Sequence, residues 1–264
     1  MKEFKVILPR TELIPFINHY WIFEENGINR DTERVIPIGC MQLVFHMETP
    51  PFSTLTNEYQ PQAFVEGHMS SYSDLTYDNH CKQVVVVFTP QGTQAFFNTP
   101  AHEFYNRYVP VEDLNDKSLT ELNIKILNTQ DKYAVVRMIE EYLMTKVQVN
   151  YYFNRICFAV KELERNSSTS IEELSKEACL SYKQFKRVFH NQIGINPKEL
   201  ARIIRFQRAM KYLQVNKDTT SNTLAEKTGY YDESHLVREF KLFTGYTPNE
   251  YIINCLTYSD YFII

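Results

Sequence analysis

The sequence predicts an α+β protein, with a β-rich N-terminal half followed by an all-helical C-terminal domain. Three observations indicate this fold class. Short β-rich runs separated by turn residues fill the N-terminal half, helical periodicity starts near Lys117, and a helix-turn-helix segment occurs twice after Asn150. The length of 264 residues is enough for two domains that each bury a core. We therefore expect a β domain over 1–115, a helical connector over 116–149 and a helical domain over 150–264.

Three apolar runs in the N-terminal half have the composition of buried β-strands: Gln42–His46, Ala63–Val65 and Gln83–Phe88. They predict a compact β-barrel or sandwich. Aromatic and histidine side chains on or near these runs are candidates to line a small-molecule pocket, because such pockets are concave and mostly apolar. The candidates are Trp21, Phe45, Phe64, His46 and His68. Packing in the core explains the aromatic residues equally well.

The connector carries an apolar stripe at helical spacing, made of Val135, Val136, Ile139, Leu143 and Val147. An apolar stripe on a helix is normally covered by another part of the protein or by a partner. We expect this stripe either to dock on the preceding β domain or to pair two copies of the chain in a homodimer.

The first helix-turn-helix unit is expected over 170–191. Ser170 and Glu173 have the spacing of a capping box at the start of its first helix, and Ser181 can cap the second helix. The face of that second helix opposite its apolar stripe is basic or polar: Lys183, Lys186, Arg187 and His190. Long basic side chains on such a helix can reach guanine edges and phosphates in a major groove.

The second unit is expected over 220–243, after a long helix over 197–214. Asp232 is the candidate cap of its second helix, and Gly229 and Gly245 allow positive φ at the turn and after the helix. The side chains predicted to face DNA are Ser234, His235, Arg238 and Lys241.

The two units are copies of one another at a nearly constant offset. Pairing their second helices 51 positions apart matches cap, apolar, arginine, glycine and proline positions: Ser181 with Asp232, Phe185 with Leu236, Arg187 with Arg238, Phe189 with Phe240, Gly194 with Gly245, Pro197 with Pro248 and Glu199 with Glu250. The preceding helices match at an offset of 50, so the second turn has one extra residue. Two such units on one chain predict a protein that binds double-stranded DNA at a tandem, asymmetric site.

These residues resemble the AraC/XylS family of bacterial transcriptional regulators. The family's run of glycine and an aromatic residue, Asp-x-Ser, an apolar residue, Arg-x-Phe-Lys and Gly-x-x-Pro is present as Gly229, Tyr230, Asp232, Ser234, Leu236, Arg238, Phe240, Lys241, Gly245 and Pro248. The resemblance covers about residues 150–255. It implies a DNA-binding domain of two helix-turn-helix units joined by a long helix. It also implies a cupin-like N-terminal β-barrel that binds a small-molecule effector or mediates dimerisation.

Two other classes of function are weaker interpretations. In the first, the barrel is a cupin-type metalloenzyme with His46, Glu48, Glu66, His68 and His80 as possible ligands. The His-x-His pattern followed by a spaced Glu is missing, and no nucleophile with a base partner and no phosphate loop is present. We therefore predict no catalytic residue, no metal and no cofactor. In the second, the barrel binds no effector and only oligomerises the chain.

Charge is unevenly distributed along the chain. Residues 1–149 contain 12 Lys and Arg against 19 Asp and Glu, whereas 150–264 contain 16 against 13. Only the C-terminal part suits a polyanion, because phosphate contact depends on local basic surface.

The five cysteines form no Cys-x-x-Cys pair, and no apolar stretch reaches the length of a membrane span. We expect reduced thiols, a cytoplasmic protein without a membrane partner, and an apolar segment over 256–264 that packs on the helical domain.

Overall fold

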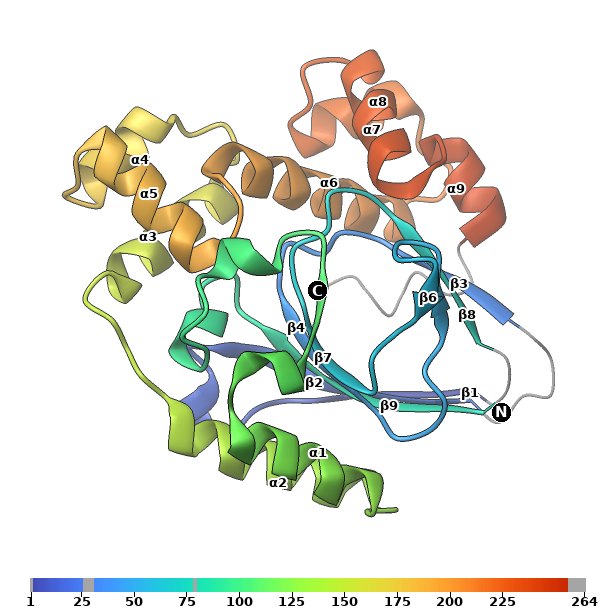
Figure 1. Cartoon of the computed structure of the whole chain (residues 1–264). Helices are drawn as coiled ribbons and strands as arrows, with labels where there is room; N and C mark the ends of the chain where they lie inside the picture. The colour runs from blue at the N-terminus through green and yellow to red at the C-terminus, as the bar shows by residue number, and fades with distance from the viewer. Residues whose placement is uncertain (1, 26–30, 78–79, 256–264) are drawn as a thin grey trace.

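The computed structural model describes residues 2–25, 31–77 and 80–255, so the segment 256–264 lies outside the described residues. Figure 1 shows a β-rich N-terminal half and a helical C-terminal half. The strands are β1 (Lys2–Ile7), β2 (Ile17–Glu25), β3 (Asp31–Val35), β4 (Gln42–His46), β5 (Phe52–Ser53), β6 (Glu58–Tyr59), β7 (Ala63–Glu66), β8 (Ser73–Tyr77), β9 (Cys81–Phe88) and β10 (Tyr108–Pro110). Short 3-10 turns are η1 (Thr11–Leu13), η2 (Thr93–Ala95), η3 (Ala101–Phe104) and η4 (Val111–Leu114).

The strands form two antiparallel sheets. The larger has the order β1-β2-β9-β4-β7-β10 and the smaller the order β3-β8-β5-β6. In the described part of the chain no strand belongs to both sheets, so the β region is an open pair of sheets rather than one closed barrel. The α+β class is confirmed, and the three predicted strands are present as β4, β7 and β9.

Side chains of the larger sheet alternate between two faces, because successive residues of a strand point to opposite sides. On β4, Leu43 and Phe45 belong to the core on the outer face of the sheet. Val44, between them, belongs to a separate cluster that includes Leu75 and Tyr77 of the smaller sheet. The larger sheet is therefore buried on both faces.

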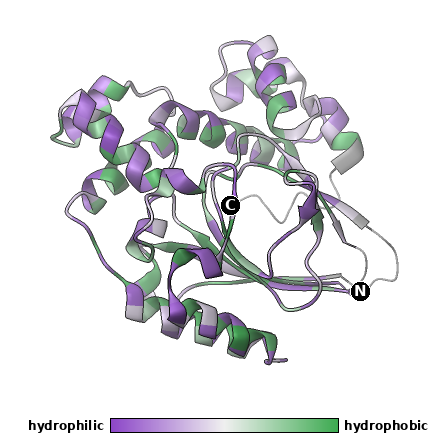
Figure 2. Ribbon diagram, viewed as in Figure 1, coloured by the Kyte–Doolittle hydropathy of each residue, from purple (hydrophilic) through white to green (hydrophobic). Residues whose placement is uncertain are grey.

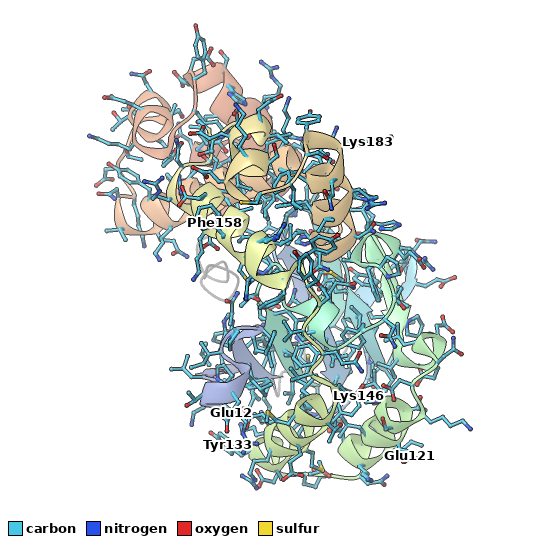
Figure 3. All side chains as sticks on the ribbon, turned by 90° about the vertical axis from the view of Figure 1, so that its left-hand side faces the viewer. Glu12, Glu121, Tyr133, Lys146, Phe158 and Lys183 are labelled. Carbon is cyan, nitrogen blue, oxygen red and sulfur yellow. The ribbon has the colours of Figure 1, made fainter. Side chains whose placement is uncertain are left out.

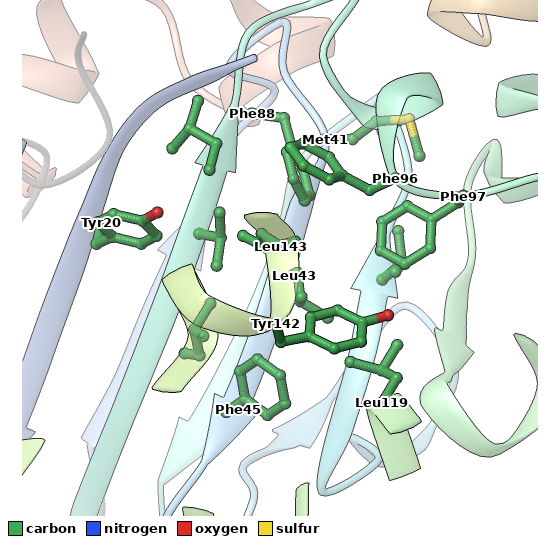
Figure 4. Packing of buried hydrophobic residues seen from close by; sticks show 14 of the residues in the cluster. Tyr20, Met41, Leu43, Phe45, Phe88, Phe96, Phe97, Leu119, Tyr142 and Leu143 are labelled. Carbon is green, nitrogen blue, oxygen red and sulfur yellow. The ribbon is translucent and has the colours of Figure 1, made fainter. Parts of the chain in front are cut away.

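Two helices cover the outer face: α1 (Lys117–Leu127) and α2 (Lys132–Lys146). Figure 4 shows Leu119 of α1 and Leu143 of α2 beside Leu43 and Phe45. The predicted connector stripe is buried in this contact, with at most 5% exposure at Val135, Val136, Ile139 and Leu143, and with Val147 packed at its edge. The stripe thus docks on its own sheet and is not available to pair two copies.

Seven further helices make up the C-terminal half: α3 (Phe153–Arg165), α4 (Ile171–Glu177), α5 (Tyr182–Ile193), α6 (Pro197–Val215), α7 (Ser221–Thr228), α8 (Glu233–Thr244) and α9 (Pro248–Cys255). Each helix–turn–helix pair, α4–α5 and α7–α8, packs near one end of α6 (Figure 1). In Figure 2, α5 and α6 change from hydrophilic to hydrophobic within each turn, as helices with one buried face do. Their apolar faces share one core cluster.

Side-chain caps fix where the helices of both units begin. Four side chains accept a hydrogen bond from the backbone N–H three residues later: Ser170, Ser181, Thr220 and Asp232. The capping box expected at Ser170 is only half formed, since no return bond from Glu173 accompanies it among the described residues. A complete box instead starts α6, where Asn196 and Glu199 bond reciprocally. The sequence carried this Asn-Pro-x-Glu signal, but the prediction began that helix at Pro197 without it.

The N-terminal half contacts the second unit through Arg34 of β3. Its Nη1 atom donates to the main-chain oxygen of Thr244, the last residue of α8, at 2.9 Å. Asp74 accepts two hydrogen bonds from the same guanidinium at 2.7 and 2.8 Å. The rings of Tyr72 and Tyr246 lie 4.1 and 4.7 Å from it. We call this arrangement the Arg34 joint.

Candidate nucleic-acid interface

The turns of the two units have the same backbone shape. Cys179 in the first turn has φ 52°, and Gly229, its partner at the offset of 50, has φ 81°. Gly245, after α8, has φ 78°, so both glycines that the sequence marked for positive φ adopt it. The left-handed region suits glycine and is unfavourable for a residue with a Cβ atom. The duplicated turn therefore keeps its conformation even where the chain has a cysteine.

The second helix of the first unit, α5, presents a basic face to solvent. Lys183, Lys186 and Arg187 are exposed, whereas Phe185 and Phe189 on the opposite face are fully buried. Figure 3 shows Lys183 near one end of the molecule, with α1 and α2 at the other. This is the arrangement that a groove-binding helix requires.

The fourth predicted side chain of α5, His190, lies at the boundary with the N-terminal half. It is exposed, but its ring stacks on His102 of η3 with the centroids 4.8 Å apart. Burial lowers the pKa of His190, and the neighbouring His102 lowers it further. A neutral, stacked ring contributes less to DNA phosphate binding than the three basic residues beside it.

The second helix of the second unit, α8, exposes Ser234, Arg238 and Lys241 as predicted. His235 is different, since it is half-buried and its Nε2 atom lies 3.5 Å from Oε1 of Glu239. Its ring also packs 5.3 Å from that of Tyr230. His235 thus faces the protein as much as the solvent.

A groove of about 1100 Å³ lies between the two units. The first residue of α5, Tyr182, and five residues of α8 line it together with the start of α4 and one side of α6. Its basic lining residues are Lys198, Arg202, Arg205, Arg238 and Lys241, against the acidic Glu172 and Glu239. Because exposed residues of both second helices border one groove, these helices are not packed back to back.

Glu239 holds α8 against α6 beneath this groove. Its carboxylate is 5% exposed and accepts hydrogen bonds from Arg202 Nε at 2.5 Å and Arg205 Nη2 at 3.3 Å. A buried carboxylate is tolerated when it is paired in this way, and removing a partner would leave it uncompensated. The pairing fixes the orientation in which α8 presents Arg238 to solvent.

The basic residues of α6 were not among the predicted site residues. Lys198, Arg202 and Arg205 recur at i, i+4 and i+7 on the side of the helix that lines the groove. This spacing places the three residues on one helical face, so a basic face of α6 could have been predicted from the sequence.

The candidates for a small-molecule pocket are divided among three places. Trp21 and Phe64 line one small cavity between the two sheets, and His46 is buried nearby with its ring 5.8 Å from that of Phe64. Phe45 points to the outer face and packs under α1 and α2. His68 is buried at the boundary with α5, near Ile193, and burial lowers its pKa to about 4.

The possible metal ligands are not gathered either. His46 and Glu66 are buried between the sheets, His68 lies at the boundary, and Glu48 and His80 are exposed. Across the described ranges, no group of three or more His, Cys, Asp or Glu residues has a metal-binding arrangement. None of the helices in these ranges combines the length and apolarity of a membrane crossing.

Family models match both halves of the chain. Residues 174–252 match a helix-turn-helix domain, and residues 5–110 match a domain of unknown function, DUF6597. An uncharacterised helix-turn-helix-type transcriptional regulator of Haemophilus influenzae is 24% identical over 159 residues. That match covers 58% of this chain and 52% of the relative, so the chain spans about half the length of the curated relative.

Two solved structures have a distant similarity to the chain. ToxT from Vibrio cholerae has 10% identity and a TM-score of 0.46, covering 89% of this chain and 97% of ToxT. A probable AraC family transcriptional regulator from Rhodopseudomonas palustris has 23% identity and a TM-score of 0.35, covering 38% of this chain and 95% of that structure. Residues 174–252, which contain most of the two duplicated units and all of their joining helix, thus match a helix-turn-helix domain, and the chain is similar to a helix-turn-helix-type transcriptional regulator.

Proposed function

We propose that the chain is a sequence-specific regulator of transcription, with residues 150–264 as its DNA-binding domain and residues 1–115 as a domain that responds to a small molecule. The observation that carries DNA binding is the basic groove between the two units, bordered by α8 and by the first turn of α5. The helix-turn-helix units extend over 170–191 and 220–243. Residues 116–149 connect the two domains.

The length of the joining helix, α6, determines the distance between the two half-sites on DNA. α6 has 19 residues, which at 1.5 Å each span about 28 Å. Successive major grooves on one face of B-DNA are about 34 Å apart, so a helix of this length can hold two recognition helices near adjacent grooves. Because both helices belong to one chain and differ in sequence, the site is tandem and asymmetric.

The proposed DNA binding involves two kinds of contact, one to phosphates and one to bases. Phosphate contacts supply affinity, and we assign one of them to Lys198, the exposed lysine of α6 that lines the groove. Base contacts supply sequence choice. We assign them to the exposed side chains Lys183, Lys186 and Arg187 of α5 and Ser234, Arg238 and Lys241 of α8.

Selection of bound sites from random duplex DNA with the purified full-length protein tests the proposal. We expect a two-part motif whose halves are about one helical turn apart, with binding that weakens as salt rises. Recovery of no enriched motif at low ionic strength would overturn the proposal.

Arg238→Ala is expected to weaken binding to the selected site about tenfold and to relax base preference in one half of the motif only. The matched control is Lys125→Ala, which removes an exposed basic residue from α1, outside the groove. Repeating the selection with each variant measures both effects. Unchanged preference in both halves with Arg238→Ala would show that this side chain does not contact bases.

A further inference from the structure

The inner face of the larger sheet carries buried polar residues on strands whose buried residues on the outer face are apolar. On the outer face, β4 and β9 contribute Leu43, Phe45, Val84, Val86 and Phe88 to an apolar core. At the alternate positions of β4, β7 and β9 lie four buried polar residues: Gln42, His46, Glu66 and Gln83. Burying polar groups is costly unless they gain partners, so a purely structural core would repeat the apolar pattern of the outer face.

Three of these polar residues, Gln42, Glu66 and Gln83, line a small cavity between the sheets. Its volume is about 30 Å³, and Gln42, Gln60, Glu66 and Gln83 line it together with the aromatic residues Trp21, Phe64 and Tyr77. The volume corresponds to roughly one water molecule, which is about the size of a primary ammonium group, and a larger head group requires the lining side chains to move apart.

Glu66 provides charge and an unused acceptor at this cavity. Its side chain is almost completely buried, with Oε2 accepting a hydrogen bond from Nε2 of Gln42 at 2.9 Å. Within the described residues, Oε1 of Glu66 accepts none, and this atom is not completely buried. Desolvation raises the pKa of this carboxyl to about 7, so its ionised form is destabilised until an opposite charge arrives.

The other charges near the cavity are also negative. None of its lining residues is Lys, Arg or His. Glu33, which is buried on β3, alternates with Val35 on the same face of that strand, and Val35 lines the cavity. An anion would be repelled here, and a neutral ligand would leave the carboxylate uncompensated.

Aromatic rings complete a site suited to a cation. Trp21, Phe64 and Tyr77 line the cavity from three different strands. A cation placed against such rings is attracted by their negative faces, most strongly when it is shielded from water. The carboxylate of Glu66, the amide oxygens of the glutamines and the ring faces are the groups of this site that attract a cation.

We propose that this cavity binds a small organic cation, a primary ammonium or guanidinium head group, whose N–H groups donate to Oε1 of Glu66 and to the glutamine side chains. The inference deepens the proposed function, because it names the chemical class of the small molecule to which the N-terminal half responds.

Thermal denaturation of the full-length protein with matched small probes tests the site. The probes are methylguanidinium, the similarly shaped neutral methylurea, methylammonium and acetate, each at millimolar concentration and constant ionic strength. We expect at least one of the two cations to raise the midpoint by about 5 °C, and methylurea and acetate to leave it unchanged. An equal effect of methylurea, or no effect of either cation, would overturn the proposal.

Two variants locate the effect. Glu66→Gln keeps the shape and removes the charge, so it is expected to abolish the shift, whereas Glu48→Gln removes an exposed carboxylate and is expected to preserve it. A shift that persists in Glu66→Gln places the cation elsewhere and contradicts the assignment. Site selection on DNA is an independent measurement, so a protein that binds DNA but ignores both cations refutes this inference alone.

Discussion

Glu66 combines two properties that are rarely combined in a structural core. Its carboxyl group is buried between the sheets, and the only hydrogen bond that its side chain accepts among the described residues comes from an amide, Gln42. Tyr108 on β10 lies close enough for Glu66 to raise the pKa of its hydroxyl. The native fold therefore holds this carboxyl in a state in which ionisation is unfavourable.

This burial makes stability depend on pH. The pKa of Glu66 rises from 4.5 to about 7 in the folded protein, so between these values the native state binds more protons than the unfolded state. The stability that proton binding by Glu66 gives to the folded state is fully present below pH 4.5. It is lost as the pH rises through about 7, the pKa of Glu66 in the folded protein. We expect Glu66→Gln to be more stable than the unsubstituted protein by about 3 kcal/mol at pH 8 and nearly equal to it at pH 4.5.

Urea denaturation at a series of pH values measures that difference. His46 and His68, whose pKa values burial lowers to about 4, destabilise both proteins equally as pH falls below 6.5, so they cancel in the comparison. A stability difference between the two proteins that stays constant from pH 4.5 to 8 would contradict the assignment.

At the scale of elements, the two helix-turn-helix units share a turn position with positive φ. Cys179 and Gly229 occupy the same left-handed turn position, although only glycine adopts it without strain. A Cβ atom built on Gly229 meets no atom within 4 Å. A side chain introduced at Gly229 therefore changes the backbone strain without causing a clash, and the effect can be compared with removal of the side chain at Cys179.

Cys179→Gly is expected to stabilise the first unit by about 1 kcal/mol, since it removes the strain of positive φ at a residue with a side chain. Gly229→Ala is expected to destabilise the second unit by about the same amount, because it introduces that strain without a clash. Thermal denaturation of each variant checks the pair. Shifts of the same sign in both variants would be inconsistent with a shared turn geometry.

Local elements were predictable from the sequence because their causes are local. Ser170, Ser181 and Asp232 cap helices through bonds to the residue three positions later, and the apolar spacing of α5 identifies its buried face. Contacts between distant segments were not predictable. Nothing near Arg202 indicates that its partner is Glu239, 37 positions away.

The same distinction applies within the β region. The sequence predicted β4, β7 and β9 from their composition, but alternation alone did not reveal which face of the sheet the helices cover. Phe45 and Phe64 therefore seemed equivalent, whereas the structure places them on opposite faces. Which aromatic residues line the cavity depends on the register of the two sheets, which long-range packing determines.

At the scale of the whole molecule, the Arg34 joint connects the β region to the end of the second recognition helix. Arg34 alternates on β3 with Glu33 and Val35, which face the region of the cavity. A guanidinium that donates to the last main-chain oxygen of α8 also complements the negative end of the helix dipole. The strand thus has one neighbour at the cavity and another at the DNA-binding domain.

Arg34→Ala is expected to raise the hydrogen-exchange rates of amides in α8 and α9 about tenfold, because the hydrogen bonds and ring contacts of the joint are lost. Amides of α4 and α5 are expected to keep their rates. Arg165→Ala is the matched control, since that arginine is exposed and its hydrogen-bonded ion pair is with Glu162 of its own helix. Equal exchange of α8 in the Arg34→Ala variant and the unsubstituted protein would contradict a role for the joint.

The joint also has a consequence for synthesis of the chain on the ribosome. Arg34 and Thr244 are 210 positions apart, so β3 emerges long before the carbonyl group that it will hold. Domains made first generally fold first, and the β region can be complete while the second recognition helix has not yet been translated. Closure of the joint therefore requires that translation has passed α8, and a nascent polypeptide arrested earlier has the guanidinium of Arg34 and the ring of Tyr72 but neither Tyr246 nor the helix end that they contact.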